Sequence, residues 1–166
     1  YSPYYKEILA KLPTNVQSVR LNTNASTVLQ ELAPLIERGV QVTVTVSFDG
    51  IGLVHDYVRW PIKWTKFVEN LMLYKSMSVD LNLWTTVCAL NINDFANILQ
   101  FVKENNFNHS WALLESPSAL NVKYKNYLTL SADVPDVLKD VVATLGDNSK
   151  ELAEYVNMQD SIRNIN

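Results

Sequence analysis

Five side chains that can do chemistry stand close together in one stretch of the sequence: Ser47, Asp49, His55, Asp56 and Arg59. A guanidinium binds a carboxylate through two parallel hydrogen bonds, and a neighbouring hydroxyl can donate one more. Ser47 and Arg59 are therefore candidates for holding the carboxylate of a small molecule. The alternative is structural: Ser47 caps a turn, and Arg59 pairs with Asp56 at the surface.

Two other combinations in this stretch favour structure over catalysis. Asp49 precedes Gly50, and an Asp-Gly pair in a tight turn usually accepts the turn's own backbone N–H groups. His55 lies beside Asp56, which suggests a proton relay, but adjacent residues on a helical turn do not face each other. No serine or cysteine stands in a nucleophile-elbow motif that such a relay could serve.

The residues before this stretch explain why a site should form there. Gln41 to Phe48 alternates β-branched residues with polar or aromatic ones, a pattern that predicts a strand. A polar turn with two glycines, Ser47 to Gly52, follows at its carboxyl end. In α/β folds the loops at the carboxyl ends of parallel strands carry binding and catalysis. The sequence therefore predicts a site before it indicates a particular chemistry.

The rest of the chain alternates helical and strand patterns. Helices are predicted from Tyr4 to Leu12 after a Ser2-Pro3 cap, from Thr27 to Arg38 between Ser26 and Gly39, from Lys63 to Tyr74, from Asn93 to Asn105, from Asp133 to Leu145 and from Asn148 to Ile162. Further strands are predicted at Val16 to Leu21, Leu81 to Cys88 and His109 to Leu114. Alternation at this spacing predicts a parallel sheet of four strands with right-handed crossovers. Pro34 is expected to kink the second helix.

Composition argues against several classes of protein. The 166 residues are 48% apolar and 19% charged, which is ordinary for one globular domain. The net charge of −3 comes without clusters of Lys and Arg, so nucleic acid is not an expected partner. No apolar run reaches the roughly 18 residues of a membrane span, and the N-terminus does not resemble a signal peptide. We therefore expect a cytoplasmic protein with no membrane partner.

The single cysteine and the aromatic residues have structural interpretations. Cys88 excludes an internal disulfide, cannot hold zinc or an iron–sulfur cluster alone, and follows an apolar strand, so a buried thiol is expected. Trp60, Trp64 and Phe67 fall at helical spacing and are expected to pack in the core. Two strand tryptophans, Trp84 and Trp111, are expected to lie beneath helices.

Three loops at predicted strand ends resemble those of a known family. They read Thr23-Asn24-Ala25-Ser26, then Ser47-Phe48-Asp49-Gly50 followed by His55-Asp56 and Arg59, then Thr86 to Asn91. In order and spacing they are similar to the C-terminal half of the core of radical S-adenosylmethionine enzymes, in the group with twitch or SPASM extensions. There the loops read T-N-G-T, then S-[IL]-D-G with a later H-D and R, then an asparagine loop. The resemblance covers about Tyr1 to Glu115.

Two motifs of that family are absent from this sequence. One is the C-x-x-x-C-x-x-C loop, whose thiolates hold a [4Fe–4S] cluster, and the other is the G-G-E loop. Both would precede Tyr1 in the family's order, because the opening helix resembles the one that follows G-G-E. We therefore expect the N-terminal, cluster-binding half to lie outside this chain, which by itself cannot bind the cluster or start a radical reaction.

The resemblance implies a fold and a function. The fold would be α/β, a partial (β/α) TIM-like barrel over residues 1–130 with a helical extension over residues 131–166. The complete protein would cleave S-adenosylmethionine reductively to a 5′-deoxyadenosyl radical that abstracts hydrogen from a substrate. In this group the substrate is often a peptide or protein. The implied cofactors are S-adenosylmethionine and a [4Fe–4S] cluster whose ligands lie outside this chain.

The resemblance also implies roles for individual residues. Ser47 and Arg59 would hold the methionine carboxylate of the cofactor. Asn24 and Asn91 would contact its ribose hydroxyls or amino group, although both suit loop or cap positions equally well. Asp49 would also lie among the cofactor contacts, beside its favoured role in the turn. No catalytic or metal-binding residue is assigned within the chain.

Two other functions stay open at this point. One is a non-catalytic α/β binding or interaction module, whose open sheet edge pairs with another chain. The other is a small hydrolase-like enzyme that uses Asp49, His55 and Glu115. For Glu115, which follows the last predicted strand, an exposed loop position is the commoner case.

Overall fold

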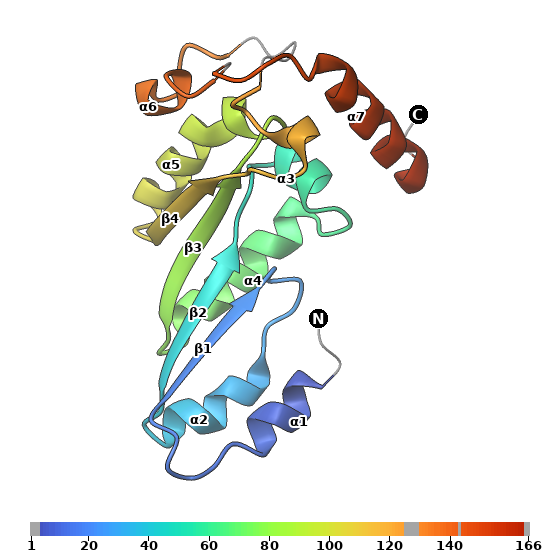
Figure 1. The fold of residues 1–166 in the computed structure, drawn as a ribbon. Helices are drawn as coiled ribbons and strands as arrows, with labels where there is room; N and C mark the ends of the chain where they lie inside the picture. The colour runs from blue at the N-terminus through green and yellow to red at the C-terminus, as the bar shows by residue number, and fades with distance from the viewer. Residues whose placement is uncertain (1–3, 125–129, 143, 165–166) are drawn as a thin grey trace.

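The computed structural model describes residues 4–124, 130–142 and 144–164, in which four strands form one parallel sheet. The strands are β1 (Ser18–Thr23), β2 (Gln41–Ser47), β3 (Asp80–Val87) and β4 (Asn108–Leu113), hydrogen-bonded in that order (Figure 1). The predicted α/β class and the four parallel strands are confirmed. Both ends of each predicted strand lie within two residues of the observed ends.

Helices connect and follow these strands. They are α1 (Tyr5–Ala10), η1 (Gln30–Leu32), α2 (Ala33–Glu37), α3 (Leu53–Val58), α4 (Trp64–Ser76), η2 (Ile92–Asp94), α5 (Phe95–Glu104), η3 (Ser118–Leu120), α6 (Asp136–Lys139) and α7 (Ser149–Arg163). The two 3₁₀ turns η1 and η2 lead directly into α2 and α5. The predicted cap at Ser2-Pro3 lies outside the described residues.

Sequential strand order places the connecting helices on one face of the sheet. Right-handed crossovers between neighbouring parallel strands always return on the same side, so a second helical layer needs a reversal of strand order, which these strands lack. The strands show the consequence: Val42, Val44 and Val46 of β2 are buried, whereas the residues between them are partly exposed. The valines share one core with Phe67 and Leu71 of α4. Each such buried side chain contributes about 1.5–3 kcal/mol.

Two predicted helices are wrong in extent. Residues 27–29 are not helical, and the segment predicted as one helix is a 3₁₀ turn followed by α2. Pro34 lies in the first turn of α2, where its missing N–H costs nothing, so it starts a helix instead of kinking one. Among the described residues of the stretch predicted from Asp133 to Leu145, the four of α6 form a helix and the others do not. Short apolar periodicity does not outweigh the cost of nucleating a helix.

Two tryptophans, Trp60 and Trp84, differ from expectation, whereas Trp111 packs against a helix as expected. Trp60 is 49% exposed and therefore not a core residue. Trp84 and Trp111 are each 38% exposed, but for different reasons. Trp111 shares a face with the buried side chains and packs edge-on against Phe95 of α5, with ring centroids 5.5 Å apart. Trp84 alternates with buried Leu83 and Thr85, so it projects from the face opposite the one that the described helices cover.

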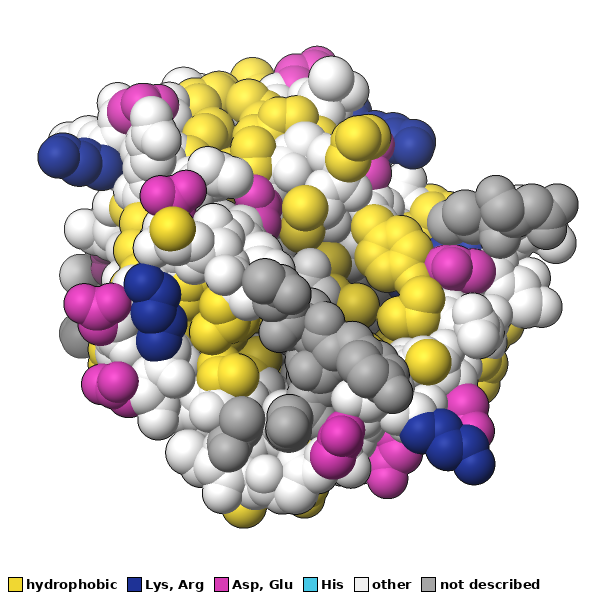
Figure 2. Space-filling view, turned by 90° about the horizontal axis from the view of Figure 1, so that it is seen from above, with side chains coloured by type: hydrophobic (Ala, Val, Ile, Leu, Met, Phe, Trp, Pro, Cys, Tyr) yellow, Lys and Arg dark blue, Asp and Glu magenta, His cyan; other side chains and the backbone are white. Residues whose placement is uncertain are grey.

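The two ends of the sheet differ in what surrounds them. In Figure 1, α6 and α7 lie at the end to which the strand arrows point, while α1 and α2 lie at the other end. Seen from the α6–α7 end, acidic and basic side chains are scattered around the edge of the molecule, with hydrophobic ones between them (Figure 2). Among the described residues, no helix has the length and apolar character needed to cross a membrane.

Candidate functional site

The turn after β2 is built by carboxylates that reach across it. Asp49 is 5% exposed, and its Oδ1 accepts the backbone N–H of Thr86 in β3 at 2.8 Å. Its Oδ2 pairs with Nη2 of Arg59. The expectation that Asp49 accepts its own turn's N–H groups is therefore wrong, as is the alternative pairing of Arg59 with Asp56. Asp56 instead accepts the N–H of Trp64 at 2.6 Å, at the start of α4.

The guanidinium of Arg59 has a described partner at one nitrogen and none at another. Its side chain is 25% exposed, and Nη2 is engaged by Asp49. Its Nε is buried and has no hydrogen-bond partner among the described residues. Burial raises the pKa of the Asp49 carboxyl, while the positive charge of Arg59 and the N–H of Thr86 oppose that rise. The pair thus fixes a cation at the carboxyl end of the sheet with part of its fork unpaired.

A second carboxylate secures the same turn from the α5 side. Asp94 is 8% exposed, and its Oδ2 accepts the N–H of Ile51 at 2.6 Å while Oδ1 accepts from Asn97 at 2.8 Å. A Cβ on Gly50 would stand 2.8 Å from the backbone nitrogen of His55. Glycine is therefore required at that position by the close approach of α3.

The side-chain amide of Asn91 bonds to backbone groups through both its nitrogen and its oxygen. It is 1% exposed; its Nδ2 donates to the carbonyls of Asp49 and Thr86 at 3.1 and 3.0 Å, and its Oδ1 accepts the N–H of Cys88 at 2.7 Å. Cys88 is 5% exposed, as expected, and burial raises the pKa of its thiol to about 11. Asn91 therefore ties the β2 and β3 loops together, and both protons of its amide are engaged inside the protein.

His55 lies inside an aromatic cluster. It is fully buried, with Phe67 at a centroid distance of 4.4 Å and Trp64 at 5.4 Å, and neither ring nitrogen has a hydrogen-bond partner among the described residues. Burial, aided by the charge of Arg59, lowers the pKa of His55 to about 4. At neutral pH it is an uncharged core residue, so the hypothetical relay with Asp56 has no exposed base.

The hydrolase-like trio does not assemble through any described contact. His55 is enclosed, Asp49 is paired with Arg59, and the side chain of Glu115 is 82% exposed beside Lys123. Glu115 thus has the loop position that was the commoner expectation.

A cavity of about 280 Å³ opens beside the Asp49–Arg59 pair, at the carboxyl ends of β2, β3 and β4. We call it the Arg59 cavity; it is lined by Asp49, Tyr57, Val58, Arg59, Thr86, Cys88, Leu90, Leu114, Leu120, Tyr155, Gln159 and Arg163. Its outer wall is α7, which is attached through Tyr57: the Tyr57 hydroxyl donates to Asp160 at 2.8 Å, and Arg163 donates to the Tyr57 carbonyl at 2.6 Å. Burial and the Asp160 carboxylate raise the pKa of Tyr57 to about 12.

The loop after β1 lies apart from that cavity. Asn24 Oδ1 accepts the N–H of Ser26 at 3.1 Å, a local turn bond. Ala25 is fully buried with φ of +52°, in the left-handed region that favours glycine. Two buried side chains of α4 hold this loop: Asn70 donates to the Ala25 carbonyl at 2.8 Å, and Tyr74 contacts Thr27 and Leu29 through its hydroxyl at 3.2 and 3.1 Å.

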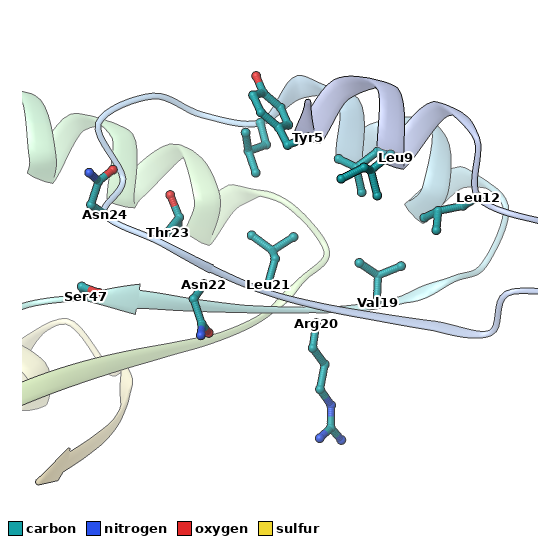
Figure 3. A pocket seen from close by; sticks show the side chains of 12 residues that line it. Tyr5, Leu9, Leu12, Val19, Arg20, Leu21, Asn22, Thr23, Asn24 and Ser47 are labelled. Atoms are coloured by element: carbon teal, nitrogen blue, oxygen red, sulfur yellow. The ribbon is translucent and has the colours of Figure 1, made fainter. Parts of the chain in front are cut away.

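Beside β1 runs an apolar groove of about 510 Å³, which we call the β1 groove. It is lined by Tyr5, Ile8, Leu9, Leu12, Val19, Arg20, Leu21, Asn22, Thr23, Asn24, Leu29 and Ser47. In Figure 3, Val19 and Leu21 point toward α1, whereas Arg20 and Asn22 point to the opposite side of the strand.

A third hollow, of about 420 Å³, is lined by Asn22, Thr45, Ser47, Asn82 and Trp84. We call it the Trp84 hollow. Ser47 lines this hollow and the β1 groove, whereas Arg59 lines the Arg59 cavity. The five predicted cofactor contacts thus fall into two groups: Asp49, Arg59 and Asn91 are joined by short contacts, while Ser47 and Asn24 lie along the β1 groove.

Sequence reasoning missed several residues that build these sites. Asp94, Asn70 and Tyr74 lie at the buried sides of helices and bond across to loops far away in sequence. The detectable signal was a polar residue at an inward position of helical spacing. For Trp84 the signal was strict alternation in β3, which assigns it to the face opposite Leu81 and Leu83.

Comparisons with known proteins leave the family open: no family model, curated protein or solved structure matches the chain. Among the described residues, no group of three or more His, Cys, Asp or Glu side chains is arranged to hold a metal ion.

Proposed function

We propose that this chain is half of a partial (β/α) barrel of the radical S-adenosylmethionine type, and that Arg59 binds the carboxylate of the cofactor's methionine moiety. The single observation that carries the proposal is the hydrogen bonding of the Arg59 guanidinium. Asp49 engages Nη2, the buried Nε has no partner among the described residues, and the side chain lines the Arg59 cavity. A guanidinium oriented in advance, with an unused edge, is suited to a carboxylate ligand.

Two features of the fold support the proposal. Strands in sequential order, with crossovers on one side, form the curved sheet from which (β/α) barrels are made. Ala25 has a left-handed backbone at the position where the family's T-N-G-T loop has glycine. S-Adenosylmethionine would supply the radical chemistry when cleaved, whereas this chain would bind and orient the molecule.

The [4Fe–4S] cluster has no fitting ligand set here. The sequence has one cysteine, and Cys88 is buried with a pKa raised to about 11, the opposite of an iron-binding thiolate. Cluster ligands would have to come from residues outside this sequence. For the complete protein we propose a peptide or protein substrate, as the resemblance implies.

The open reading frame that contains this chain gives the first test. The proposal requires a C-x-x-x-C-x-x-C loop and a G-G-E loop upstream of Tyr1; a reading frame with neither overturns it. The second test is calorimetric titration of the protein encoded by that frame with S-adenosylmethionine. Arg59→Lys keeps the charge beside Asp49 but removes the planar fork, so we expect affinity to fall at least about tenfold. Arg38→Lys, an exposed arginine bonded to carbonyls of the 13–14 turn, is the control.

A second candidate function is a binding module that accepts a strand from another chain at β1. The observation that favours it is the β1 edge: β1 pairs with β2 on one side, and no described strand pairs with its other side. An unpaired strand edge beside an apolar groove is suited to strand addition. Leu21→Asp would place a charge in the β1 groove and abolish such binding, measured as loss of a higher-mass species in light scattering; an unchanged mass distribution would count against this function.

A further inference from the structure

The face of the sheet that lies opposite the helices is polar and uncharged near its centre. Alternation places Thr45 and Ser47 of β2 and Asn82 and Trp84 of β3 on this face. Asn22 of β1 joins them, pointing away from α1 in Figure 3. We call it the polar face.

Strand register arranges these residues in two rows. Asn22 pairs with Thr45, Thr45 with Asn82, and Asn82 with Asn108, so one row crosses all four strands. Neighbours within a row are about 4.8 Å apart. The next row, about 6–7 Å nearer the carboxyl ends, consists of Ser47, Trp84 and Ser110. An indole thus stands beside a line of carboxamide and hydroxyl groups.

The side chains in these rows are available to a ligand. Those of Asn22, Thr45 and Asn82 make no hydrogen bond with any described residue, in contrast to Asn91. Trp84 is 38% exposed at the surface of the hollow. None of the five lining residues carries a charge, so the Trp84 hollow offers a flat apolar surface with neutral donors and acceptors around it.

That combination matches a particular chemistry. A nucleobase has an aromatic face that stacks on tryptophan and an edge on which donors and acceptors alternate. A carboxamide pairs with such an edge through its donor and its acceptor together. Asn82, two residues before Trp84 on the same face, is placed to reach the edge of a ring stacked on the indole.

We propose that the Trp84 hollow binds an uncharged nucleobase, presented as a free nucleoside, by stacking on Trp84 and pairing with Asn82. A nucleic acid polymer is a poorer fit, because phosphate binding needs several cations and, within the four described strands, the sequence supplies one, Arg20, one step toward the amino ends. The proposal goes beyond the function proposed above and does not depend on it. It involves neither the Arg59 cavity nor a cluster.

Calorimetric titration of the 166-residue chain with adenosine, guanosine, cytidine and uridine tests the proposal. We expect at least one nucleoside to bind and Trp84→Ala to weaken it by about five- to 150-fold, the range measured for loss of one base stack. Trp111→Ala is the matched control, since Trp111 is equally exposed but lies on the helix-covered face against Phe95. The thermal midpoint of unfolding of each variant, measured without nucleoside, is compared with that of the wild type.

Three outcomes overturn the proposal. They are no binding of any of the four nucleosides, equal weakening by the two tryptophan variants, and preferential binding of methyl glucoside, which has hydroxyl groups but no aromatic face. Because destabilisation can imitate a loss of binding, Trp84→Phe is included: it keeps an aromatic face and should retain more affinity than Trp84→Ala. Because the Trp84 hollow contains no residue of the Asp49–Arg59 pair, this proposal and the carboxylate role of Arg59 succeed or fail separately.

Discussion

The Arg59 cavity and the Trp84 hollow lie on the same sheet, but they differ in whether their polar side chains are hydrogen-bonded within the protein. At the Arg59 cavity, Asp49 is engaged by Arg59 and by Thr86, and Asn91 makes three hydrogen bonds nearby. In the Trp84 hollow, the side chain of Asn82 makes no hydrogen bond with the described residues. Asp49 and Asn91, which belong to the recognisable sequence motif, therefore mainly hold loops together. Asn82, which belongs to no motif, has a side chain without a described partner on the open face of the sheet.

This contrast teaches how to read a strand-end motif. Buried polar groups must be hydrogen-bonded, so a motif of buried carboxylates and amides is first a means of fixing a loop. In the segment after β2, the Nε of Arg59 and both ring nitrogens of His55 are buried without a partner among the described residues. A polar group on an open sheet face has no such obligation, because water satisfies it until a ligand displaces the water.

Removing the Asp49 carboxylate should have the largest effect on stability. Asp49→Ala leaves the Arg59 charge and the Thr86 N–H without their partner, and loss of one member of a buried pair costs about 3–5 kcal/mol. Urea unfolding measures the change. The control is Asp136→Ala, whose side chain is 93% exposed in its pair with Lys139 and should shift stability by about 0.5 kcal/mol or less. Similar small losses in both variants would show that the turn does not depend on this pair.

Acidification should unfold the protein partly through His55. Its folded pKa of about 4 lies below the ordinary value of 6.5, so the unfolded state binds the proton more readily. The stabilisation is complete above pH 6.5 and is lost as pH falls toward 4, a loss on the order of 3 kcal/mol. His55→Phe should remove this part of the pH dependence of the unfolding free energy. Parallel pH profiles for the variant and the wild type would contradict the buried, neutral histidine.

Two asparagines give the sharpest matched pair. Asn91→Ala leaves three backbone groups without the side chain that bonds to them, and it should lower the free energy of unfolding by about 2–3 kcal/mol. Asn82→Ala removes a side chain that bonds to no described residue and should change stability by about 0.5 kcal/mol or less. Equal losses in chemical denaturation would remove the distinction between the built cavity and the open hollow.

The smallest effect is expected at Ala25. Glycine would relieve the left-handed backbone strain of about 1 kcal/mol, but it would also lose a buried methyl group and add freedom to the unfolded chain. We expect Ala25→Gly to change the unfolding free energy by less than about 1 kcal/mol. A large loss on thermal denaturation would mean that the methyl group is a more important packing contact than its backbone geometry suggests.

Much of the fold could be predicted because β2 and β3 show uninterrupted alternation, which fixes both the strands and their faces. Boundaries failed where local signals conflicted: Pro34 starts a helix in the middle of the segment predicted as one. Asp49 and Arg59 lie in contact at the carboxyl end of β2, as the strand pattern predicts, and their role in binding a ligand stays a prediction. Which carboxylate Arg59 would take was not predictable, because Asp49 and Asp56 are both near it in sequence and only the tertiary path of the loop selects one.

The Trp84 hollow was missed for a different reason. The expectation that Trp84 lies beneath a helix conflicts with the alternation in β3, which places Trp84 opposite buried Leu83 and Thr85. The register that lines up Asn22, Thr45 and Asn82 joins three separate strands, and no local sequence pattern contains it. Such rows become visible only when the pairing of the strands is known.

Side-chain amide spectra recorded during a nucleoside titration test the contrast most directly. In ¹⁵N–¹H correlation spectra of the 166-residue chain, we expect the Nδ2 protons of Asn82 and the indole N–H of Trp84 to shift, and the Nδ2 protons of Asn91 to stay in place. Shifts at Asn91 with none at Asn82 and Trp84 would show that the ligand-binding surface is the Arg59 cavity and that the polar face is not a site.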